Sequence, residues 1–415
     1  MQGGASGGGT DRAATPIGIA RLSKMMFDGQ DLTPLWRDLI GKYVYSRDDA
    51  AALMDLATVE QLFGNLEDGL ARQAEALEIC RIYQSPIAEP TAPRLRLLAF
   101  AAPGDLGTNT PLEFLLEGSD VALSTLYVVP GLPLPETIPA HDLAFVAAGE
   151  SDDNLPILAE IERLAARWPR PVLNRPDRVL SLSRERLCAL LDGAPGLTMP
   201  MTLRIDRTSL QRLATGMVAL ADLLPDGAFP VIARPVGSHA GRGLAKLDDA
   251  AAVAGYLASH LESEFYLSRF VDYRDGDGLF RKYRVVFIEG APYACHMAIA
   301  DQWMIYYLNA DMKSSAAKRA EEERFMADFD TGFARRHGSA LSAIAARVGL
   351  DYFGIDCAEA ADGRLLLFEA DIAMIVHAMD DPAHFPYKQP QMRKVFDAFC
   401  AMLRRRSGRG PATAA

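Results

Sequence analysis

The most constraining feature of the chain is a regular alternation of short apolar segments and amphipathic helical segments between residues 94 and 175. RLRLLAFAA and VALSTLYVV read as apolar strands, and LPILAEIERLAARW carries apolar residues at helical spacing. Strands and helices that alternate at these lengths predict a parallel α/β sheet. Ligand loops of such sheets follow the carboxyl ends of the strands, which points to residues 103–110 and 149–154.

The segment before this sheet predicts helices. Residues 48–84 carry two apolar stripes at helical spacing, separated by Gly64 and Asn65, and are expected to form a helical hairpin. The hairpin resembles one tetratricopeptide-type unit, but such repeats need about three units to be stable. A helical cap on the next domain is therefore the preferred interpretation. Residues 1–24 are predicted to be a disordered leader, and residues 405–415 a disordered tail.

Composition excludes several classes of protein. The 415 residues carry 43 Lys and Arg against 54 Asp and Glu, a net charge of −11 that disfavours nucleic-acid binding. No apolar run approaches the roughly 20 residues of a membrane-spanning helix, so no membrane partner is expected. The five cysteines are scattered singly, which argues against a zinc knuckle or a disulfide framework. These features favour a cytoplasmic protein that handles small molecules.

The strongest candidate site is a carboxylate cluster near the C-terminus. Asp356 lies in one apolar strand segment, and Glu369 and Asp371 lie in the next, with a turn at Asp362 and Gly363 between the segments. Glu369 and Asp371 are two residues apart on a strand, so their side chains point to the same face. Buried carboxylates need a compensating charge, and hard cations such as Mg²⁺ take this set of oxygens. A solvated acidic strand edge is the alternative interpretation.

Two further features place positive charge or open backbone where phosphate could bind. The loop GSHAGRG at residues 237–243 joins two strand-like segments, and its glycines would let backbone N–H groups approach a polyphosphate. The loop lacks the GK[ST] signature of a Walker loop. Arg284 lies midway along an otherwise apolar strand segment and must find an anion, either a carboxylate or a phosphate.

Together these motifs resemble the ATP-grasp superfamily of ligases, over roughly Val172 to Ala378. The likeness is to the group of glutathione synthetase, ribosomal-protein glutamate ligase and D-alanine–D-alanine ligase. It implies a mixed α/β and α+β fold, in which a Rossmann-like domain precedes a two-lobed ATP-grasp domain. The implied regions are a helical N-terminal region at 25–92, the pre-ATP-grasp domain at 93–175, a small lobe at 176–267 and a large lobe at 268–404.

The resemblance also implies roles for particular residues. The segments ERLCALLDGAPGLTMPMTL, FPVIARPVGSHAGRGL and YLSRFV resemble the family's ATP-binding segments. The ATP-binding residues implied by this match are Arg186, Arg234, Gly241, Arg242, Gly243, Phe270 and Val271. KYRVVFIEG resembles the strand whose arginine clamps phosphate or acyl phosphate, here Arg284, and Asn309 matches an asparagine ahead of the substrate loop. Asp356, Glu369 and Asp371 match the metal set.

Three departures from the family pattern are visible. Both basic ATP residues are arginine where lysine is commoner, although an arginine fork still suits phosphate oxygens. Asp371 stands where the family has asparagine. The family's NxxPG ending is replaced by DIAMIVHAMDDP, in which His377 is either a buried structural residue or a catalytic one.

The implied activity is an ATP- and Mg²⁺-dependent joining of a carboxylate to an amine through an acyl phosphate, with Mn²⁺ as a second suitable ion. The substrates would be small-molecule or peptide carboxylates and amines, and the resemblance also allows a homodimer. Two other functions stay open. One is a nucleotide-binding regulatory or adaptor protein with a degenerate ATP-grasp domain, and the other is a small-molecule kinase on the same fold.

Overall fold

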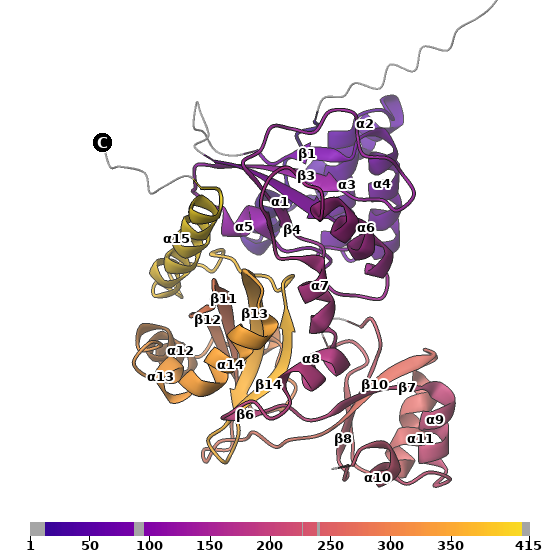
Figure 1. Cartoon of the computed structure of the whole chain (residues 1–415), viewed down its shortest axis with the longest axis vertical. Coiled ribbons are helices and arrows are strands. Elements are labelled where there is room, and N and C mark those ends of the chain that lie inside the picture. Colours follow the sequence, from indigo (N-terminus) through magenta and orange to yellow (C-terminus); the bar gives the residue numbers. More distant parts are fainter. Residues whose placement is uncertain (1–12, 87–94, 226, 239–240, 409–415) are drawn as a thin grey trace, which may run out of the picture. The chain divides into compact units, whose positions relative to one another are not determined.

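The computed structural model describes residues 13–86, 95–225, 227–238 and 241–408 (Figure 1). The chain forms two compact units. The first is drawn from Met1–Gly149, Asp153–Asp177 and Ile372–Ala415, and the second from Glu150–Asp152 and Arg178–Asp371. Within the described residues, no helix is both long enough and apolar enough to cross a membrane.

The first unit is built on a five-stranded sheet with the order β1-β3-β2-β4-β5. Its strands are β1 (Ile82–Gln84), β2 (Leu95–Ala101), β3 (Val121–Tyr127), β4 (Leu143–Val146) and β5 (Val172–Leu173). The strands from β2 to β5 pair in parallel, whereas β1 pairs antiparallel with β3. Every residue of β4 is buried, as expected for a parallel strand covered on both faces. The predicted parallel α/β sheet is therefore confirmed.

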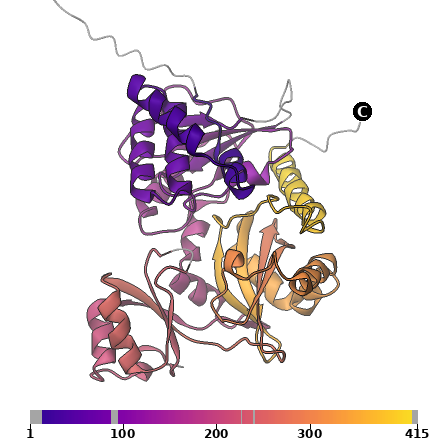
Figure 2. The same ribbon diagram turned by 180° about the vertical axis from the view of Figure 1, so that it is seen from behind.

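Helices of the first unit lie before, between and after these strands (Figure 2). They are α1 (Ile19–Phe27), α2 (Thr33–Tyr45), α3 (Ala50–Leu62), α4 (Leu66–Ile79), α5 (Leu112–Leu115), α6 (Leu155–Ala165), and α15 (Lys388–Arg406); α7 (Pro176–Val179) spans the boundary between the units. The predicted hairpin is α3 followed by α4. Asp49 caps α3 by accepting the N–H of Ala52 at 3.0 Å.

The prediction that residues 1–24 form a disordered leader is wrong for its second half. Leu22 of α1 has no exposed surface and packs in a cluster with Leu32, Leu39 and Leu56. The apolar face of α1 is short and follows a glycine- and alanine-rich segment, so the sequence alone does not indicate a helix there. The face is buried only because α3 packs against it. The remaining residues of that prediction, 1–12, lie outside the described residues.

The segment that follows the carboxylate strands also belongs to the first unit, not to the large lobe predicted at 268–404. Phe399 of α15 packs on Phe145 of β4, with ring centroids 5.9 Å apart. Arg404 pairs with Asp120 at 2.6 Å. Because α15 runs to Arg406, the predicted tail starts too early, and residues 409–415 of it lie outside the described part of the chain.

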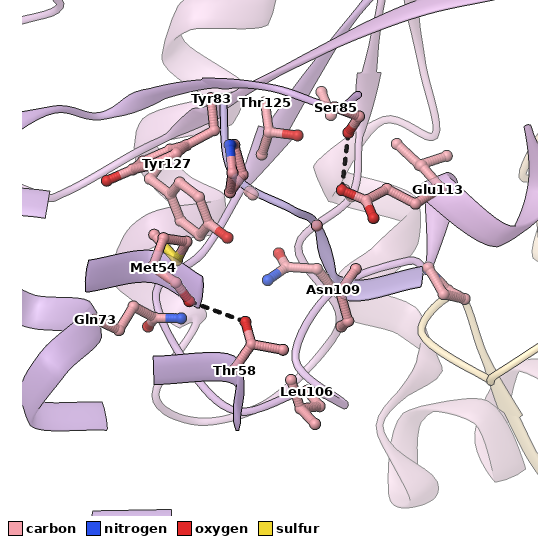
Figure 3. A pocket seen from close by; sticks show the side chains of 18 of the residues that line it. Met54, Thr58, Gln73, Tyr83, Ser85, Leu106, Asn109, Glu113, Thr125 and Tyr127 are labelled. Carbon is pink, nitrogen blue, oxygen red and sulfur yellow. Dashed lines mark hydrogen bonds between the residues drawn. The ribbon is translucent and has the colours of Figure 1, made fainter. Parts of the chain in front are cut away.

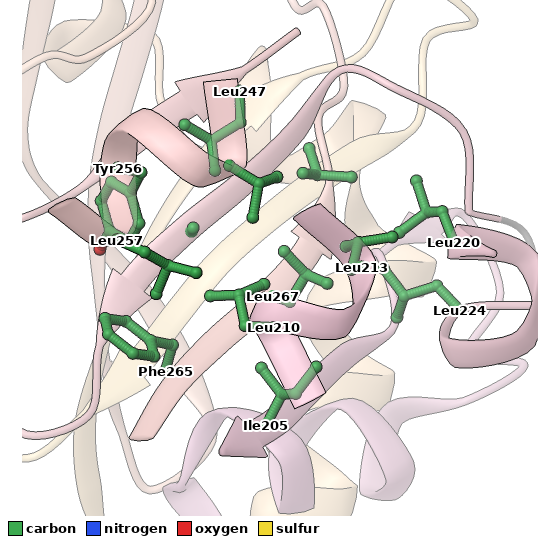
Figure 4. Close-up of a cluster of buried hydrophobic side chains, with 13 residues drawn as sticks. Ile205, Leu210, Leu213, Leu220, Leu224, Leu247, Tyr256, Leu257, Phe265 and Leu267 are labelled. Carbon is green, nitrogen blue, oxygen red and sulfur yellow. The ribbon is translucent and has the colours of Figure 1, made fainter. Parts of the chain in front are cut away.

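The second unit contains two sheets, and the smaller has the order β7-β10-β8-β9. Its elements are β7 (Thr202–Asp206), α9 (Arg207–Ala214), α10 (Leu220–Leu223), β8 (Val231–Pro235), β9 (Ala245–Leu247), α11 (Ala250–Ser259) and β10 (Glu264–Arg269). Alternate residues of the strands, including Val231, Ala233, Phe265 and Leu267, pack with α9 and α11 in one apolar cluster (Figure 4). Because side chains alternate between the two faces of a strand, the intervening residues lie on the opposite face of this sheet.

The larger sheet of the second unit has the order β12-β11-β13-β14-β6. Its strands are β6 (Leu197–Thr198), β11 (Phe280–Ile288), β12 (Ala291–Ala300), β13 (Tyr352–Glu359) and β14 (Leu365–Asp371). The other elements of the unit are η1 (Leu180–Leu182), α8 (Arg184–Leu191), η2 (Tyr307–Asn309), α12 (Ala316–Ala327), α13 (Phe333–Arg336) and α14 (Gly338–Val348). The hairpin between β11 and β12 turns at Glu289 and Gly290, both of which have positive φ.

Candidate functional site

The face of the smaller sheet that α9 and α11 leave uncovered carries basic and aromatic side chains. Arg204, Tyr266 and Arg234 stand opposite one another across β7, β10 and β8. Ser268, Ile232 and Lys246 form the next row on the same face, across β10, β8 and β9. These side chains share a face because the residues between them fill the apolar cluster.

Arg234 is half-buried on this face of the smaller sheet. Its guanidinium donates to the carbonyl and the hydroxyl oxygen of Ser238. Burial and the nearby Arg184 guanidinium together lower its pKa to about 10. Two arginines drawn together with part of their hydration removed favour an anion, because each guanidinium presents a fork of donors to oxygen.

The residue beside Arg234 is Arg184, not the predicted Arg186. Arg184 donates to the carbonyl of Phe368 at 3.1 Å and forms an ion pair with Glu369. Arg186 is exposed and donates to the carbonyl of Leu180 at 3.1 Å. Residues two apart on a helix point in different directions, so only one of the two arginines at the start of α8 turns toward the strands.

Asp356 is fully buried, at 1% exposed, and is held by two cations from β11. The guanidinium of Arg284 binds it with both arms, Nε at 2.8 Å and Nη2 at 3.0 Å, and Lys282 Nζ lies 2.7 Å from Oδ2. Burial alone would raise the pKa of Asp356, but Arg284 and Lys282 hold it far below its usual value. Arg284 thus has the anionic partner that the sequence requires, and that partner is a carboxylate.

The other two predicted metal ligands lie on β14. Glu369 stands directly opposite Asp356 in the antiparallel register, and Asp371 stands opposite Gly354. Burial alone would raise the pKa of Glu369, but Arg184 lowers it below its usual value. Asp356 and Glu369 are thus each balanced by basic side chains of the protein, which supply the compensating charge that buried carboxylates need. In the described part of the chain, no group of three or more His, Cys, Asp or Glu is arranged to hold a metal ion.

The glycine loop depends on glycine at the positions predicted. Gly241 and Gly243 have φ of +75° and +65°, which L side chains rarely adopt. A Cβ on Gly243 would lie 2.6 Å from Cδ of Pro235, whereas a Cβ on Gly241 would meet only Sδ of Met304, at an ordinary contact distance of 3.8 Å. Arg242 between them is exposed, and His239 and Ala240 of the predicted loop lie outside the described residues.

Phe270 follows β10 and lies beside a cleft of ≈ 400 Å³. Its ring packs edge-on against Trp303 at 5.7 Å, and Lys246 Nζ lies 5.3 Å from the ring centroid. The backbone N–H of Phe270 donates to the carbonyl of Pro230 at 3.0 Å, so this N–H is already used within the protein. Val271 comes next in the chain and is half-buried. The residues lining the cleft are Lys246, Phe270, Asp272, Arg274, Phe280, Asp301, Gln302 and Trp303.

Two predicted residues are placed elsewhere. Asn309 is exposed and is used locally, because its Oδ1 accepts the N–H of Tyr306 at 3.1 Å. His377 belongs to the first unit, where its ring packs edge-on against Phe27 at 5.6 Å. Neither residue contributes a described contact to the Arg284 and Asp356 pair.

The structure adds Lys282 to the site and brings out Glu150 within a loop that the sequence indicates. Lys282 lies two before Arg284 on the same strand face, a signal that strand alternation would have provided. Glu150 lies in the ligand loop predicted at residues 149–154. Burial and the neighbouring Glu185 and Asp371 carboxylates together raise its pKa to about 7. The sequence indicates the loop, whereas the proximity of these distant carboxylates arises only from folding.

The fold is similar to solved structures of ATP-grasp proteins and of D-alanine ligases. One is the VanG D-Ala:D-Ser ligase of Enterococcus faecalis, with 12% identity and a TM-score of 0.46 over 74% of this chain and 98% of that chain. Another is the D-alanine–D-alanine ligase of Bacillus anthracis in complex with ATP, with 11% identity and a TM-score of 0.46 over 76% and 99%. A RimK-domain ATP-grasp protein of Sphaerobacter thermophilus gives 16% identity and a TM-score of 0.40 over 76% and 98%.

No protein-family model and no curated protein matches the chain. At the identities above, the likeness concerns the fold alone. Function must therefore be inferred from the site itself.

Proposed function

We propose that the chain is an ATP-dependent ligase of the ATP-grasp type, which joins a carboxylate to an amine through an acyl phosphate. The observation that carries the proposal is the pair Arg184 and Arg234, held beside Glu369 within the second unit. Two half-buried arginines on an otherwise acidic chain suit the phosphates of a nucleotide. The adjacent loop of Gly241 and Gly243 offers backbone N–H groups to the same phosphates.

The cleft beside Phe270 is the proposed site for adenine. The ring faces of Phe270 and Trp303 provide apolar contact for a planar base, and Lys246 would lie toward the phosphates. Val271 is proposed as the backbone contact, since the N–H of Phe270 is already used by Pro230.

We propose that Mg²⁺ would bind here through two carboxylates, fewer protein ligands than the three that the resemblance implies. Glu369 and Asp371 share one face of β14 and would hold the ion together with phosphate oxygens, because Mg²⁺ is commonly bound by one or two carboxylates plus substrate phosphates. Asp356 is a poor ligand because Arg284 and Lys282 already occupy both of its oxygens. When bound, the ion would neutralise charge that develops on the transferred phosphoryl group.

The chain's own residues would then act as follows. Arg184 and Arg234 bind and orient the phosphates, which places the γ-phosphorus for attack by a substrate carboxylate. Arg284, held rigid by Asp356, stabilises the negative charge of the acyl phosphate while an amine displaces phosphate. The acceptor is a small molecule or a peptide.

The test of this proposal is nucleotide turnover by matched arginine variants. Arg184→Met should raise the KM for ATP at least tenfold, because it removes one of the paired guanidinium groups. Arg186→Met, two residues away and exposed, should leave the KM within about twofold. ADP release should require both a carboxylate and an amine, with a product lighter by one water than the sum of the two substrates.

Three other outcomes would contradict the proposal. A product that gains a phosphate would instead indicate a kinase. ATP binding without turnover, across a broad panel of carboxylates and amines, would indicate a regulatory or adaptor protein. Equal effects of the two arginine substitutions would remove Arg184 from the nucleotide site.

A further inference from the structure

A cavity of ≈ 120 Å³ lies within the first unit, under the N-terminal helices (Figure 3). Its walls come from α3 and α4, from β1, β2 and β3, and from the loop that follows β2. Figure 3 shows the side chains of Tyr83, Thr125, Tyr127 and Asn109 around this space, with Glu113 bound to Ser85 at its edge. The cavity therefore opens at the carboxyl end of β2, where a parallel sheet places its ligands.

The lining of this cavity is acidic. It includes Asp55, Asp105 and Glu113, and among the described residues that line it there is no lysine, arginine or histidine. Asp55 is 5% exposed and accepts the backbone N–H groups of Ile17 at 2.8 Å and Gly18 at 3.2 Å.

The Glu113 carboxylate also accepts hydrogen bonds from neutral donors only, among the contacts described. It accepts the N–H of Ala20 at 2.9 Å and the hydroxyl of Ser85 at 2.8 Å. The two carboxylates thus hold the first turn of α1 through neutral donors. Burial and the charge of Glu113 together raise the pKa of Asp55 to about 6, so the negative charge of the pair is only partly compensated.

A third acceptor in the lining is unused. Oε1 of Gln61 is buried and has no hydrogen-bond partner among the described residues. Leaving a buried carbonyl oxygen unpaired costs about 1–3 kcal/mol, so a donor from a ligand would be favoured there. The rings of Tyr83 and Tyr127, 5.8 Å apart and edge-to-face, give the cavity an aromatic wall.

We propose that this cavity binds a small organic ammonium ion. An ammonium group brings positive charge to Asp55 and Glu113 and a donor to Gln61, and its alkyl part packs on the tyrosine rings. An anionic ligand would meet like charge, and an apolar ligand would leave Gln61 unpaired. An engineered cavity of about 150 Å³ holds benzene, so the room here suits a ligand of roughly six non-hydrogen atoms.

The experiment uses the full chain without nucleotide, so its result is independent of the proposed ligase activity. Propylammonium chloride is titrated by calorimetry, with potassium chloride at equal ionic strength as the salt control and 1-propanol as the neutral isostere. We expect saturable binding of propylammonium and none of 1-propanol. Absence of saturable propylammonium binding, or equal binding of 1-propanol, would overturn the proposal.

Substitutions at two positions, Thr125 and Gln61, test whether propylammonium binds in the cavity. Thr125→Leu fills the space and should weaken propylammonium binding at least tenfold, whereas Thr125→Ser keeps the space and should bind within about twofold of the wild type. Gln61→Leu removes the unused acceptor without removing volume. It should weaken binding about fivefold or more while leaving the melting temperature of the free protein unchanged or higher. Binding that is indifferent to both Thr125→Leu and Gln61→Leu would place the ammonium elsewhere and refute the assignment.

Discussion

Replacement of Asp356 by asparagine separates two roles for the buried carboxylate. As the shared partner of Arg284 and Lys282, the Asp356 carboxylate stabilises the second unit even when no metal ion is bound. As a metal ligand clustered with Glu369 and Asp371, it would instead destabilise the metal-free protein through repulsion between like charges. Asp356→Asn keeps the size of the side chain and removes the charge, so the two roles predict opposite changes in stability without metal.

The expected size of the effect follows from burial. Breaking a buried ion pair by removing one partner costs about 3–5 kcal/mol, because the remaining charge stays desolvated. The side chains of Arg284 and Lys282 keep 18% and 21% of their exposure, so water can partly replace the lost carboxylate. We therefore expect a loss near the lower end, about 3 kcal/mol. For domains of about 150–250 residues, this corresponds to a melting temperature lowered by roughly 6–12 °C.

The assay is thermal unfolding by calorimetry in EDTA at pH 7. The matched control is Asp362→Asn, which breaks an exposed pair with Arg364 at 2.7 Å and should cost less than about 1 kcal/mol. A melting temperature of Asp356→Asn within about 2 °C of the wild type, or above it, would refute the ion-pair role. The pKa of Asp356 is lowered in the folded protein, so its contribution is present above the unfolded pKa and is lost as the pH falls below it.

Three further predictions test other parts of the structure. The pKa of Asp55 is raised to about 6, so the folded protein keeps this carboxyl protonated between about pH 4 and 6, and the free energy of unfolding falls by about 3 kcal/mol as the pH rises through that window. In urea titrations at several pH values, Asp55→Asn should flatten this fall. An unchanged dependence of the free energy of unfolding on pH would contradict the assignment. Gly243→Ala should destabilise by about 1–3 kcal/mol because of its contact with Pro235, and Gly241→Ala by about 1 kcal/mol, with equal losses counting against the steric argument. Leu22→Ala should lower the free energy of unfolding by about 2–5 kcal/mol. A change below about 0.5 kcal/mol would indicate that α1 adds little to stability, as expected of a disordered leader.

Local patterns predicted most of the regular structure because they record which face of each element is buried. Alternation of apolar strands and helices gave the parallel sheet of the first unit, and the stripe in residues 48–84 gave α3 and α4. Helix α1 was missed because its single buried leucine has meaning only against the helices that cover it.

For the candidate site, the sequence indicates which residues to consider but not which partners they contact. The order of motifs along the chain was enough to select Arg234, Arg284 and the carboxylates of β13 and β14 as candidates for the site. Pairing was not predictable from that order. Whether Arg184 or Arg186 reaches Glu369 depends on the rotation of α8 about its axis. Whether Asp356 faces a metal or a guanidinium depends on the register between β11 and β13.

By itself, therefore, the sequence determined the class of fold, the charged residues that must find partners and the glycines that a tight loop requires. Only the tertiary structure decided which partners they find. It placed Lys282 and Arg284 on Asp356, returned residues 372–406 to the first unit, and enclosed Asp55 and Gln61 in one cavity. The physical reason is that periodicity reports burial over a few residues, whereas ion pairs and cavities join residues that are far apart in the chain.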